Sequence, residues 1–192
     1  SVRLGALEDV ERSEGEEIGL RVFIGQRSAS ISASDMNPAT LETLVERCIA
    51  MAREAPEDPY AGLAPEDRLL KKRPHSLDLT DEEEPEPAAL RERALMAEDA
   101  ARSVPGITNS EGGGASSGRS QVALATSHGF AGAYAGTSHA TRASVLAGAG
   151  SDMQRDHASH SARHLRDLDH ADAVGVRAGQ RAVARLNPVK VG

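Results

Sequence analysis

The chain has 192 residues and a formal net charge of −7, with no Trp, two Phe and two Tyr. Its core must therefore be built mainly from Leu, Val, Ile and Ala, and an Ala-rich core buries little area per residue. A protein that grips nucleic acid usually has a concentrated basic patch, because phosphate neutralisation supplies most non-specific affinity. The densest charged run here is acidic, residues 81–86, so direct nucleic-acid binding is disfavoured.

The single cysteine, Cys48, excludes an intramolecular disulfide and a cysteine-rich zinc site. It falls on the apolar side of a helical pattern, where a small buried thiol is expected. No apolar run is long enough to span a bilayer, and no signal peptide opens the sequence. We therefore expect a cytoplasmic chain without membrane contact. Because Ser1 already lies in an alternating pattern and the last residues resemble a linker, we expect a piece of a longer protein.

Residues 1–34 predict paired strands. Apolar and other residues alternate with the period of two that a half-buried strand requires: Ile18, Leu20, Val22 and Ile24 against Gly19, Arg21 and Phe23. The Gly25-Gln26 pair is a turn candidate. Asn37 and Pro38 suit the start of a helix, and apolar residues continue at helical spacing to about Ala52.

Residues 55–87 are acidic and rich in proline, from Pro56 to Pro87 with Pro74 between them, which is typical of an extended surface connector. A second helix is predicted over 88–104 and a last one over 172–186. Between them, from residue 106 to about 163, Gly and Ser replace the helical pattern. Three short segments in this region suit an antiparallel sheet: residues 121–127, 130–137 and 143–147.

Strands separated by a few helices, without strict alternation, indicate an α+β fold with a mainly antiparallel sheet and a few packed helices. We expect residues 1–104 to hold strands, two helices and the acidic connector. Residues 105–192 would hold the Gly/Ser-rich strands and the final helix.

Residues 113–120 approach a phosphate-binding loop, but Arg119 stands where that motif requires Lys. Such a loop wraps backbone N–H groups around phosphate at the start of a helix, whereas residues 121–127 suit a strand. We therefore interpret residues 113–120 as the glycine turn of a hairpin rather than as a nucleotide site.

His157, His160 and His164 would share one face of a helix and could then bind a metal ion. In a strand, His157 would point away from the other two. None of the seven histidines is followed by Glu, so the H-E-x-x-H and H-E-x-x-x-H zinc-protease patterns are missing from the sequence. A solvated surface cluster is the favoured interpretation, and no metal ion or other cofactor is expected in this chain.

No catalytic residue is assigned. Ser127 and His128 are adjacent, which in a strand places their side chains on opposite faces, and Ala125 replaces the first glycine of a G-x-S-x-G elbow. A basic stripe recurs every four residues along the last predicted helix: Arg177, Arg181 and Arg185. Such stripes are usually solvated, and a partner's acidic surface is the better functional alternative.

Several short motifs are poorly explained by folding pattern alone. They cover nearly the whole chain, and they are residues 17–25 (with Arg21), 51–53, 57–63 (with Asp58 and Tyr60), 109–112 (with Asn109), 126–130 (with Ser127, Gly129 and Phe130), 153–156 (with Arg155 and Asp156) and 186–190. In order and spacing these motifs resemble the TldD/PmbA family. The residues in these motifs are more similar to those of the PmbA branch, also called TldE, than to those of TldD. At His157 the family pattern suggests an aromatic residue instead.

The resemblance implies the N-terminal domain of one subunit of a heterodimeric metalloprotease that digests peptides or unfolded polypeptides and matures certain modified peptides. In that assembly a TldD-like subunit carries zinc on an H-E-x-x-x-H motif, and the PmbA subunit lacks the motif and shapes the chamber. The family is also described as a modulator of DNA gyrase, which the acidic charge does not support as direct DNA contact.

We therefore expect a non-catalytic PmbA-type subunit whose partners are a zinc-bearing, TldD-like subunit and a peptide substrate. Its strand edges would accept a peptide backbone by added-strand hydrogen bonding. Two alternatives stay open. One is a free-standing regulatory or adaptor protein that acts through the acidic connector, and the other is a metal-binding enzyme that uses His157, His160 and His164.

Overall fold

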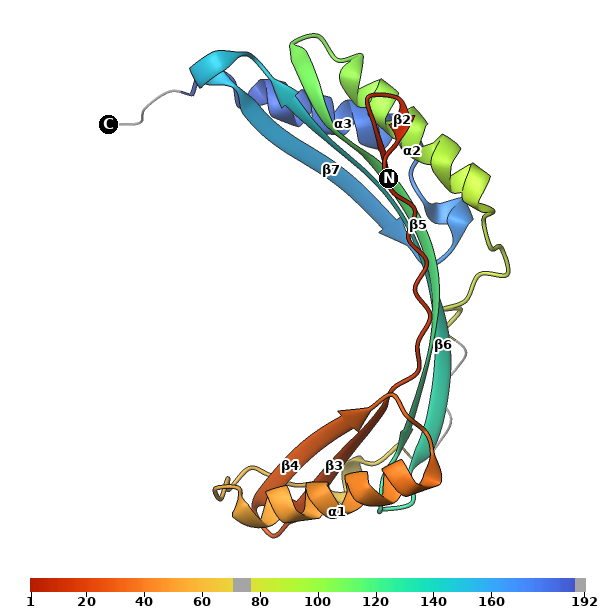
Figure 1. Ribbon diagram of the computed structural model, residues 1–192, viewed down its shortest axis with the longest axis vertical. Helices are drawn as coiled ribbons and strands as arrows, with labels where there is room; N and C mark the ends of the chain where they lie inside the picture. Colours follow the sequence, from red (N-terminus) through yellow and green to blue (C-terminus); the bar gives the residue numbers. More distant parts are fainter. Residues whose placement is uncertain (71–76, 189–192) are drawn as a thin grey trace. The chain divides into compact units, whose positions relative to one another are not determined.

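The computed structural model describes residues 1–70 and 77–188, and the chain forms two compact units (Figure 1). The larger unit comprises residues 1–10 and 73–192, and the smaller unit comprises residues 11–72. This division differs from the expected boundary at residue 104. The second helix, α2 (Pro87–Arg102), packs on strands from the second half of the chain, so it belongs to the larger unit.

The larger unit is built on a five-stranded antiparallel sheet with the strand order β2-β1-β5-β6-β7. Its strands are β1 (Val2–Arg3), β2 (Ala6–Leu7), β5 (Ile107–Ala125), β6 (Ala131–Ala147) and β7 (Gln154–Ala162). Helices α2 and α3 (Ala171–Ala184) pack against each other and against this sheet (Figure 1). The predicted α+β fold with a mainly antiparallel sheet is therefore confirmed.

Strands β5 and β6 are longer than the sequence suggested, and they pair continuously from Ile107↔Ala147 to Ala125↔Ala131 apart from two irregularities near the start of β5. The expected glycine turn over residues 113–120 is wrong, because this stretch lies inside β5. A Cβ atom on Gly113 would overlap the carbonyl oxygen of Ala94 in α2. The glycines here let a helix approach the sheet closely and do not reverse the chain.

Helices α2 and α3 also cross at close backbone distance. A Cβ atom on Gly175 would overlap the carbonyl oxygen of Ala97, and one on Gly179 would lie 2.6 Å from a methyl group of Val104. The buried apolar cluster consists of small residues, as the composition predicts: Ala97, Ala101, Ala143, Val145, Ala147, Ala158, Ala171, Val174, Ala178 and Ala182. Because these side chains are small, the core depends on close approach of the elements themselves.

A buried carboxylate ties the N-terminus of the chain to α2. Glu98 is fully buried, and its Oε1 accepts hydrogen bonds from Leu4 N at 2.7 Å and Ser110 Oγ at 2.5 Å. Its Oε2 accepts from Gly5 N at 3.0 Å. Burial alone would raise the pKa of Glu98, but these hydrogen bonds outweigh it and the pKa is lowered. Val2 also pairs with Gly113, so the turn between β1 and β2 is fixed on two sides.

The smaller unit consists of a hairpin and one helix. Strands β3 (Ile18–Ile24) and β4 (Arg27–Ala33) pair antiparallel around a turn at Gly25, whose φ is 59°. Helix α1 (Pro38–Glu54) begins after Asn37, whose side chain accepts a hydrogen bond from Ala39 N. Cys48 is fully buried, with its sulfur 3.5 Å from the carbonyl oxygen of Ala29. The predicted strands, turn, helix start and buried thiol are confirmed.

In the described part of the expected connector, residues 55–70 and 77–87, there is one short 3₁₀ helix, Glu66–Arg68, and α2 begins at Pro87. Pro74 lies outside the described residues. Across the described ranges, no helix has both the length and the apolar character needed to cross a bilayer.

Candidate functional site

The buried face of β6 changes from apolar to polar along the strand. Beyond the apolar core it continues with Thr141, His139 and Thr137, which are 0%, 1% and 5% exposed. Arg93 of α2 donates a 2.7 Å hydrogen bond from Nε to Thr141 Oγ1. The next two residues lie under the segment that precedes α2, residues 77–83, which we call the strap.

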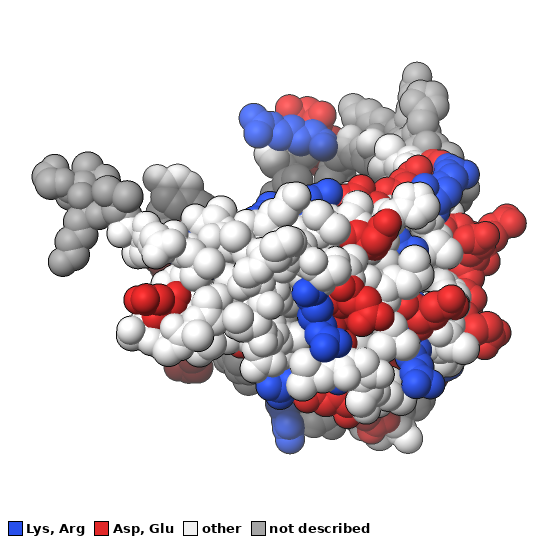
Figure 2. Space-filling view, turned by 90° about the horizontal axis from the view of Figure 1, so that it is seen from above, with Lys and Arg blue, Asp and Glu red and all other residues white. Residues whose placement is uncertain are grey.

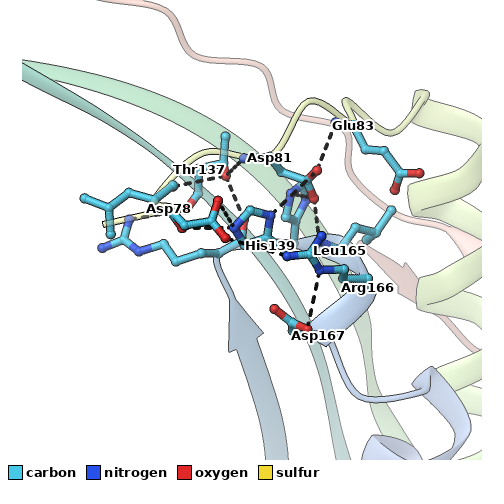
Figure 3. Close-up of polar contacts among 11 residues, drawn as sticks. Asp78, Asp81, Glu83, Thr137, His139, Leu165, Arg166 and Asp167 are labelled. Atoms are coloured by element: carbon cyan, nitrogen blue, oxygen red, sulfur yellow. Dashed lines mark hydrogen bonds and ion pairs between the residues drawn. The ribbon is translucent and has the colours of Figure 1, made fainter. Parts of the chain in front are cut away.

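Asp81 is the centre of the strap's contacts (Figure 3). Its carboxylate accepts hydrogen bonds from Leu165 N at 2.6 Å and Glu83 N at 3.1 Å. These two bonds, the one from Leu165 first, hold the pKa of Asp81 below its usual range although burial opposes them, and the nearby His164 and His139 lower it further. The ring nitrogens of His139 and His164 lie 3.4 and 4.0 Å from the same carboxylate.

Thr137 bonds to the strap on one side and to the chain after β7 on the other. Its N–H donates to Leu79 O at 2.9 Å, and its hydroxyl accepts from Asp81 N at 2.8 Å. The same hydroxyl lies 2.7 Å from Arg163 O, to which it donates. Both roles of this hydroxyl are therefore taken by the main chain, and it is not presented as a nucleophile.

His139 is the most deeply placed titratable group of this cluster. Within the described part of the chain, neither of its ring nitrogens has a hydrogen-bond partner, although Nε2 faces Asp81. His164 is 8% exposed, and its Nε2 lies 3.0 Å from Asp78 O. Both histidines thus lie against the strap: His139 faces Asp81, and His164 contacts Asp78 and Asp81.

An acidic pocket of about 420 Å³ opens beside the strap. Its lining comes almost entirely from the strap and the segment after β7: Asp78, Thr80, Asp81, Glu82, Glu83, His164 and Arg166. Arg166 pairs with Asp78 and Asp167 at 3.7 and 3.8 Å (Figure 3). Acidic residues outnumber basic ones in the lining of the pocket. The hydrogen bonds of Asp81, which lies in this lining, hold the strap in place.

The three candidate metal ligands are not brought together. His157 and His160 lie on opposite faces of β7, as the strand pattern predicts, and His164 follows the end of that strand. Their side chains are 75%, 35% and 10% exposed. In residues 1–70 and 77–188, no three His, Cys, Asp or Glu side chains are arranged to hold a metal ion. The arrangement does not fit a resident zinc ion.

The motif residues in the smaller unit are exposed. The Arg21 guanidinium lies 5.5 Å from the centre of the Phe23 ring, beside a shallow groove of about 320 Å³. Asp58 caps a turn by accepting a 2.9 Å hydrogen bond from Tyr60 N. Tyr60 itself is 94% exposed.

In the larger unit, Asn109 lies at an irregularity of β5 and accepts a hydrogen bond from Ser110 N. Ser127 and Gly129 form the turn between β5 and β6, where Thr126 N donates to the carbonyl of Phe130 at 2.9 Å. The pair Ser127-His128 is therefore in a turn and not in the strand that the sequence suggested.

Arg155 and Asp156 form ion pairs across neighbouring elements. Arg155 pairs with Glu111 of β5 at 3.2 Å, and Asp156 pairs with Arg185 at 2.9 Å. The pKa of Asp156 is lowered, mainly by the hydrogen bond from Arg185 and then by that from His157 N. Both motif residues hold β7 in place.

The arginines of the basic stripe also bond within the chain, although Arg181 and Arg185 are exposed, as expected of a solvated face. Arg177 bonds to Asp169 at 2.8 Å, Arg181 to the carbonyl of His157 at 3.2 Å, and Arg185 to Asp156. All three arginines therefore attach α3 to β7 and to the chain that follows it.

Acidic and basic side chains are interspersed on the face shown in Figure 2, and no continuous basic surface is visible there. This view agrees with the net charge of −7. It gives no support to phosphate-backbone binding on that face, because such binding relies on clustered Lys and Arg.

The far part of the β5–β6 hairpin has open edges. β7 pairs only with residues 139–147 of β6, and β1 meets β5 only at Gly113. Residues 114–125 and 131–138, which we call the distal ribbon, therefore have one strand neighbour each among the described residues. Large apolar side chains are exposed on it: Val122 (45%), Leu124 (59%) and Tyr134 (58%).

The chain matches two family models over most of its length. Residues 80–186 match the PmbA/TldA metallopeptidase central domain, and residues 1–52 match domain 1 of the same proteins. Among solved structures, a Bacteroides thetaiotaomicron protein described as a modulator of DNA gyrase is 25% identical, with a TM-score of 0.79 over 90% of this chain and 40% of its own. TldE from Thermococcus kodakarensis, 19% identical, superimposes with a TM-score of 0.72 over 95% of this chain and 40% of its own.

Curated relatives with similar sequences belong to the same family as these matches. The metalloprotease PmbA of Escherichia coli is 33% identical over all 192 residues, and a PmbA homologue of Haemophilus influenzae is 29% identical over the same length. The chain spans 42% of the length of each of these relatives, so it corresponds to part of them. With the fold, both domain matches and these identities in agreement, the chain belongs to the PmbA/TldD metallopeptidase family.

Proposed function

We propose that this chain is the N-terminal part of a non-catalytic, PmbA-type subunit of a cytoplasmic metalloprotease that acts on peptides and unfolded polypeptides. The observation that carries the proposal is the match of the whole chain to proteins named metalloprotease PmbA. Amide hydrolysis with zinc requires an ion that polarises water and a carboxylate that accepts its proton. A TldD-like partner subunit would supply both.

The contribution of this chain would be to bind and align the substrate. An open strand edge has unpaired main-chain N–H and C=O groups. An extended peptide can form hydrogen bonds with them through its own main chain, whatever its amino-acid sequence. The distal ribbon has such edges. Many of the residues that β5 contributes to it are small, for example Gly118 and Ala123. Small side chains leave the backbone accessible, which suits a substrate that is recognised by its main chain.

A free-standing adaptor that acts through the acidic segment is the second candidate. Glu82, Glu83 and Glu84 are exposed and could meet a basic partner. Asp81, in contrast, is occupied by Leu165 and Glu83. The adaptor hypothesis therefore depends on acidic residues of the connector other than Asp81, and Glu86 is exposed as well.

The test is an assay of unfolded-polypeptide hydrolysis with the purified chain, with and without zinc, and then with a TldD-type subunit added. We expect no cleavage by the chain alone under either condition, and zinc-dependent cleavage only with the second subunit present. Zinc-dependent cleavage by this chain alone would refute the proposal. Stable co-purification with a protein that has no zinc motif, and not with a TldD-type subunit, would favour the adaptor.

A further inference from the structure

Helices α2 and α3 lie on the same side of the sheet in the larger unit, and no α-helix in the described part of that unit lies on the other side (Figure 1). Side chains of β6 alternate between the two sides: Ala143 is in the buried cluster, whereas Arg142 is exposed. Arg142 pairs with Gly114 of β5 and with Ser159 of β7. We call the side of the sheet that bears Arg142 the open face.

Small residues surround Arg142 on the open face. The strand registers place six of them beside it or on the adjoining positions: Gly114, Ser116, Ala140, Ser144, Ser159 and Ser161. Three of the serines, Ser116, Ser159 and Ser161, are exposed. A serine hydroxyl can donate a hydrogen bond to an anion. The surface around Arg142 is therefore polar and rich in hydrogen-bond donors.

The side chain of Arg142 lies across β5 because Gly114 has no side chain. A Cβ atom on Gly114 would stand 2.7 Å from Nε and 3.2 Å from Cγ of Arg142. Gly114 is buried, although it faces away from the helices. Among the described residues, no hydrogen bond or ion pair engages the Arg142 guanidinium. Its N–H donors are therefore held over the sheet and are available to a ligand.

Positive charge is in excess on the open face. Arg155 is matched by Glu111 at 3.2 Å, but in the described part of the chain Arg142 and Arg163 have no carboxylate partner. The Arg163 guanidinium lies over Gly136, which the alternation of β6 places on the same face as Arg142. Because the whole chain has a net charge of −7, an acidic ligand is repelled by most of its surface and attracted to the open face.

We propose that the open face binds a peptide through a carboxylate held by Arg142, so that acidic peptide segments are preferred over neutral and basic ones. The planar guanidinium matches a carboxylate in a bidentate pair, and Ser116 and Ser159 can add hydroxyl donors. Nucleic acid fits this face less well, because phosphate-backbone binding relies on many clustered Lys and Arg side chains. The inference rests on the proposed function only in taking the ligand to be a peptide, and it names the class of peptide.

An NMR titration of the isotope-labelled chain measures both the affinity and the place of binding. The probe is a Thr-Glu repeat peptide, and the matched control is a Thr-Gln repeat peptide of the same length at the same low ionic strength. We expect the Thr-Glu peptide to shift the amide signals of residues 112–116, 140–144 and 157–161 and to bind about threefold more tightly or better. Equal binding of both peptides, or the largest shifts on α2 and α3, would overturn the proposal. An oligo-dT that binds at the same amides more tightly than the Thr-Glu peptide would overturn the choice of a carboxylate as the ligand.

Two variants test whether Arg142 is the anchor. Arg142→Gln should weaken binding of the Thr-Glu peptide about threefold or more. Arg91→Gln removes the same charge from an exposed position on α2 and should leave the affinity nearly unchanged. Gly114→Ala keeps the charge but displaces Arg142, because the new methyl group would overlap its Nε, and it should also weaken binding. Unchanged affinity in Arg142→Gln would exclude the site, and unchanged affinity in Gly114→Ala would mean that diffuse charge, not a positioned guanidinium, attracts the peptide.

The result can be separated from that of the proposed function, because the titration uses this chain alone, without zinc or a second subunit. Binding of the acidic peptide at Arg142, together with no cleavage when a TldD-type subunit is added, would support this site and refute the proposed function. Zinc-dependent cleavage with the second subunit, together with no preference of this chain for the Thr-Glu peptide, would support the proposed function and refute this site.

Discussion

The main-chain N–H of Leu4 donates a 2.7 Å hydrogen bond to the carboxylate of Glu98, 94 residues further along the chain. Together with Gly5 N and Ser110 Oγ, this bond gives a fully buried carboxylate three donors. A buried charge is costly unless it is hydrogen-bonded in this way. The N-terminal turn thus depends on one side chain of α2.

Glu98→Gln should destabilise the larger unit. The amide keeps the size of the side chain, but its NH₂ group cannot accept from the main-chain donors, so at least one contact becomes donor against donor. We expect a loss of about 1–3 kcal/mol in the free energy of unfolding. Urea unfolding followed by circular dichroism measures it. Glu92→Gln, an exposed position on the same helix, should cost little.

The stability should fall on acidification. The pKa values of Glu98, Asp81, Glu111, Asp156 and Asp169 are all lowered in the fold, so the unfolded chain binds more protons at low pH. Their stabilising contribution is present above the ordinary carboxyl pKa and is lost as the pH falls through the lowered values. The advantage of the wild type over Glu98→Gln should therefore be constant from about pH 7 to about pH 5 and shrink below about pH 4. A constant difference down to acid pH would contradict the assigned role of Glu98.

Gly175→Ala should destabilise the α2–α3 contact. The added methyl group would overlap the carbonyl oxygen of Ala97 and approach Ala100 Cβ within 2.9 Å, so the helices must separate. We expect a loss of about 1–3 kcal/mol, as for overpacked cores, although Ala favours a helix. Gly118→Ala is the control, since nothing lies within 4 Å of the new methyl group. Thermal unfolding of both variants separates the effect of the steric overlap at Gly175 from the effect of replacing any glycine by alanine.

Asp81→Asn should loosen the strap. Asp81 accepts from both Leu165 N and Glu83 N, and an asparagine side chain has one oxygen for these two donors. We expect faster amide hydrogen exchange at Leu165 and at Thr137, whose N–H bonds to Leu79 O. Glu84→Gln, which is exposed, should leave both amides unchanged. Unaltered exchange in Asp81→Asn would mean that the remaining contacts hold the strap without the carboxylate.

The smaller unit was predictable because its information is local. Alternation from Ile18 to Ile24 and the Asn37-Pro38 pair specify a strand and a helix start, and the structure has both. The glycines near residue 113 were misread because a glycine run looks the same whether it turns a chain or accepts a close neighbour. That neighbour, Ala94, is on a helix whose position the sequence pattern does not give.

The cluster under the strap was missed for the same reason. Asp81, His139 and His164 are distant in sequence and meet only through the order of the strands. In β6 every second residue from Thr137 to Ala147 is buried. The first three of these are Thr137, His139 and Thr141, so no alternation of apolar residues in the sequence marked His139 as buried. The arginines of α3 required the β7 contacts, which no helical pattern shows.

The pairing of Val2 with Gly113 has a consequence for biosynthesis. Strand β1 emerges from the ribosome more than a hundred residues before Gly113 of β5, with which it pairs. In contrast, β3, β4 and α1 are close together in the sequence and form one continuous unit. Long-range pairing of this kind is slow, because the loop must close before its contacts form. Strands β1 and β2, which pair with each other, therefore wait for β5 during translation, while the residues between the two halves of their unit are free to fold.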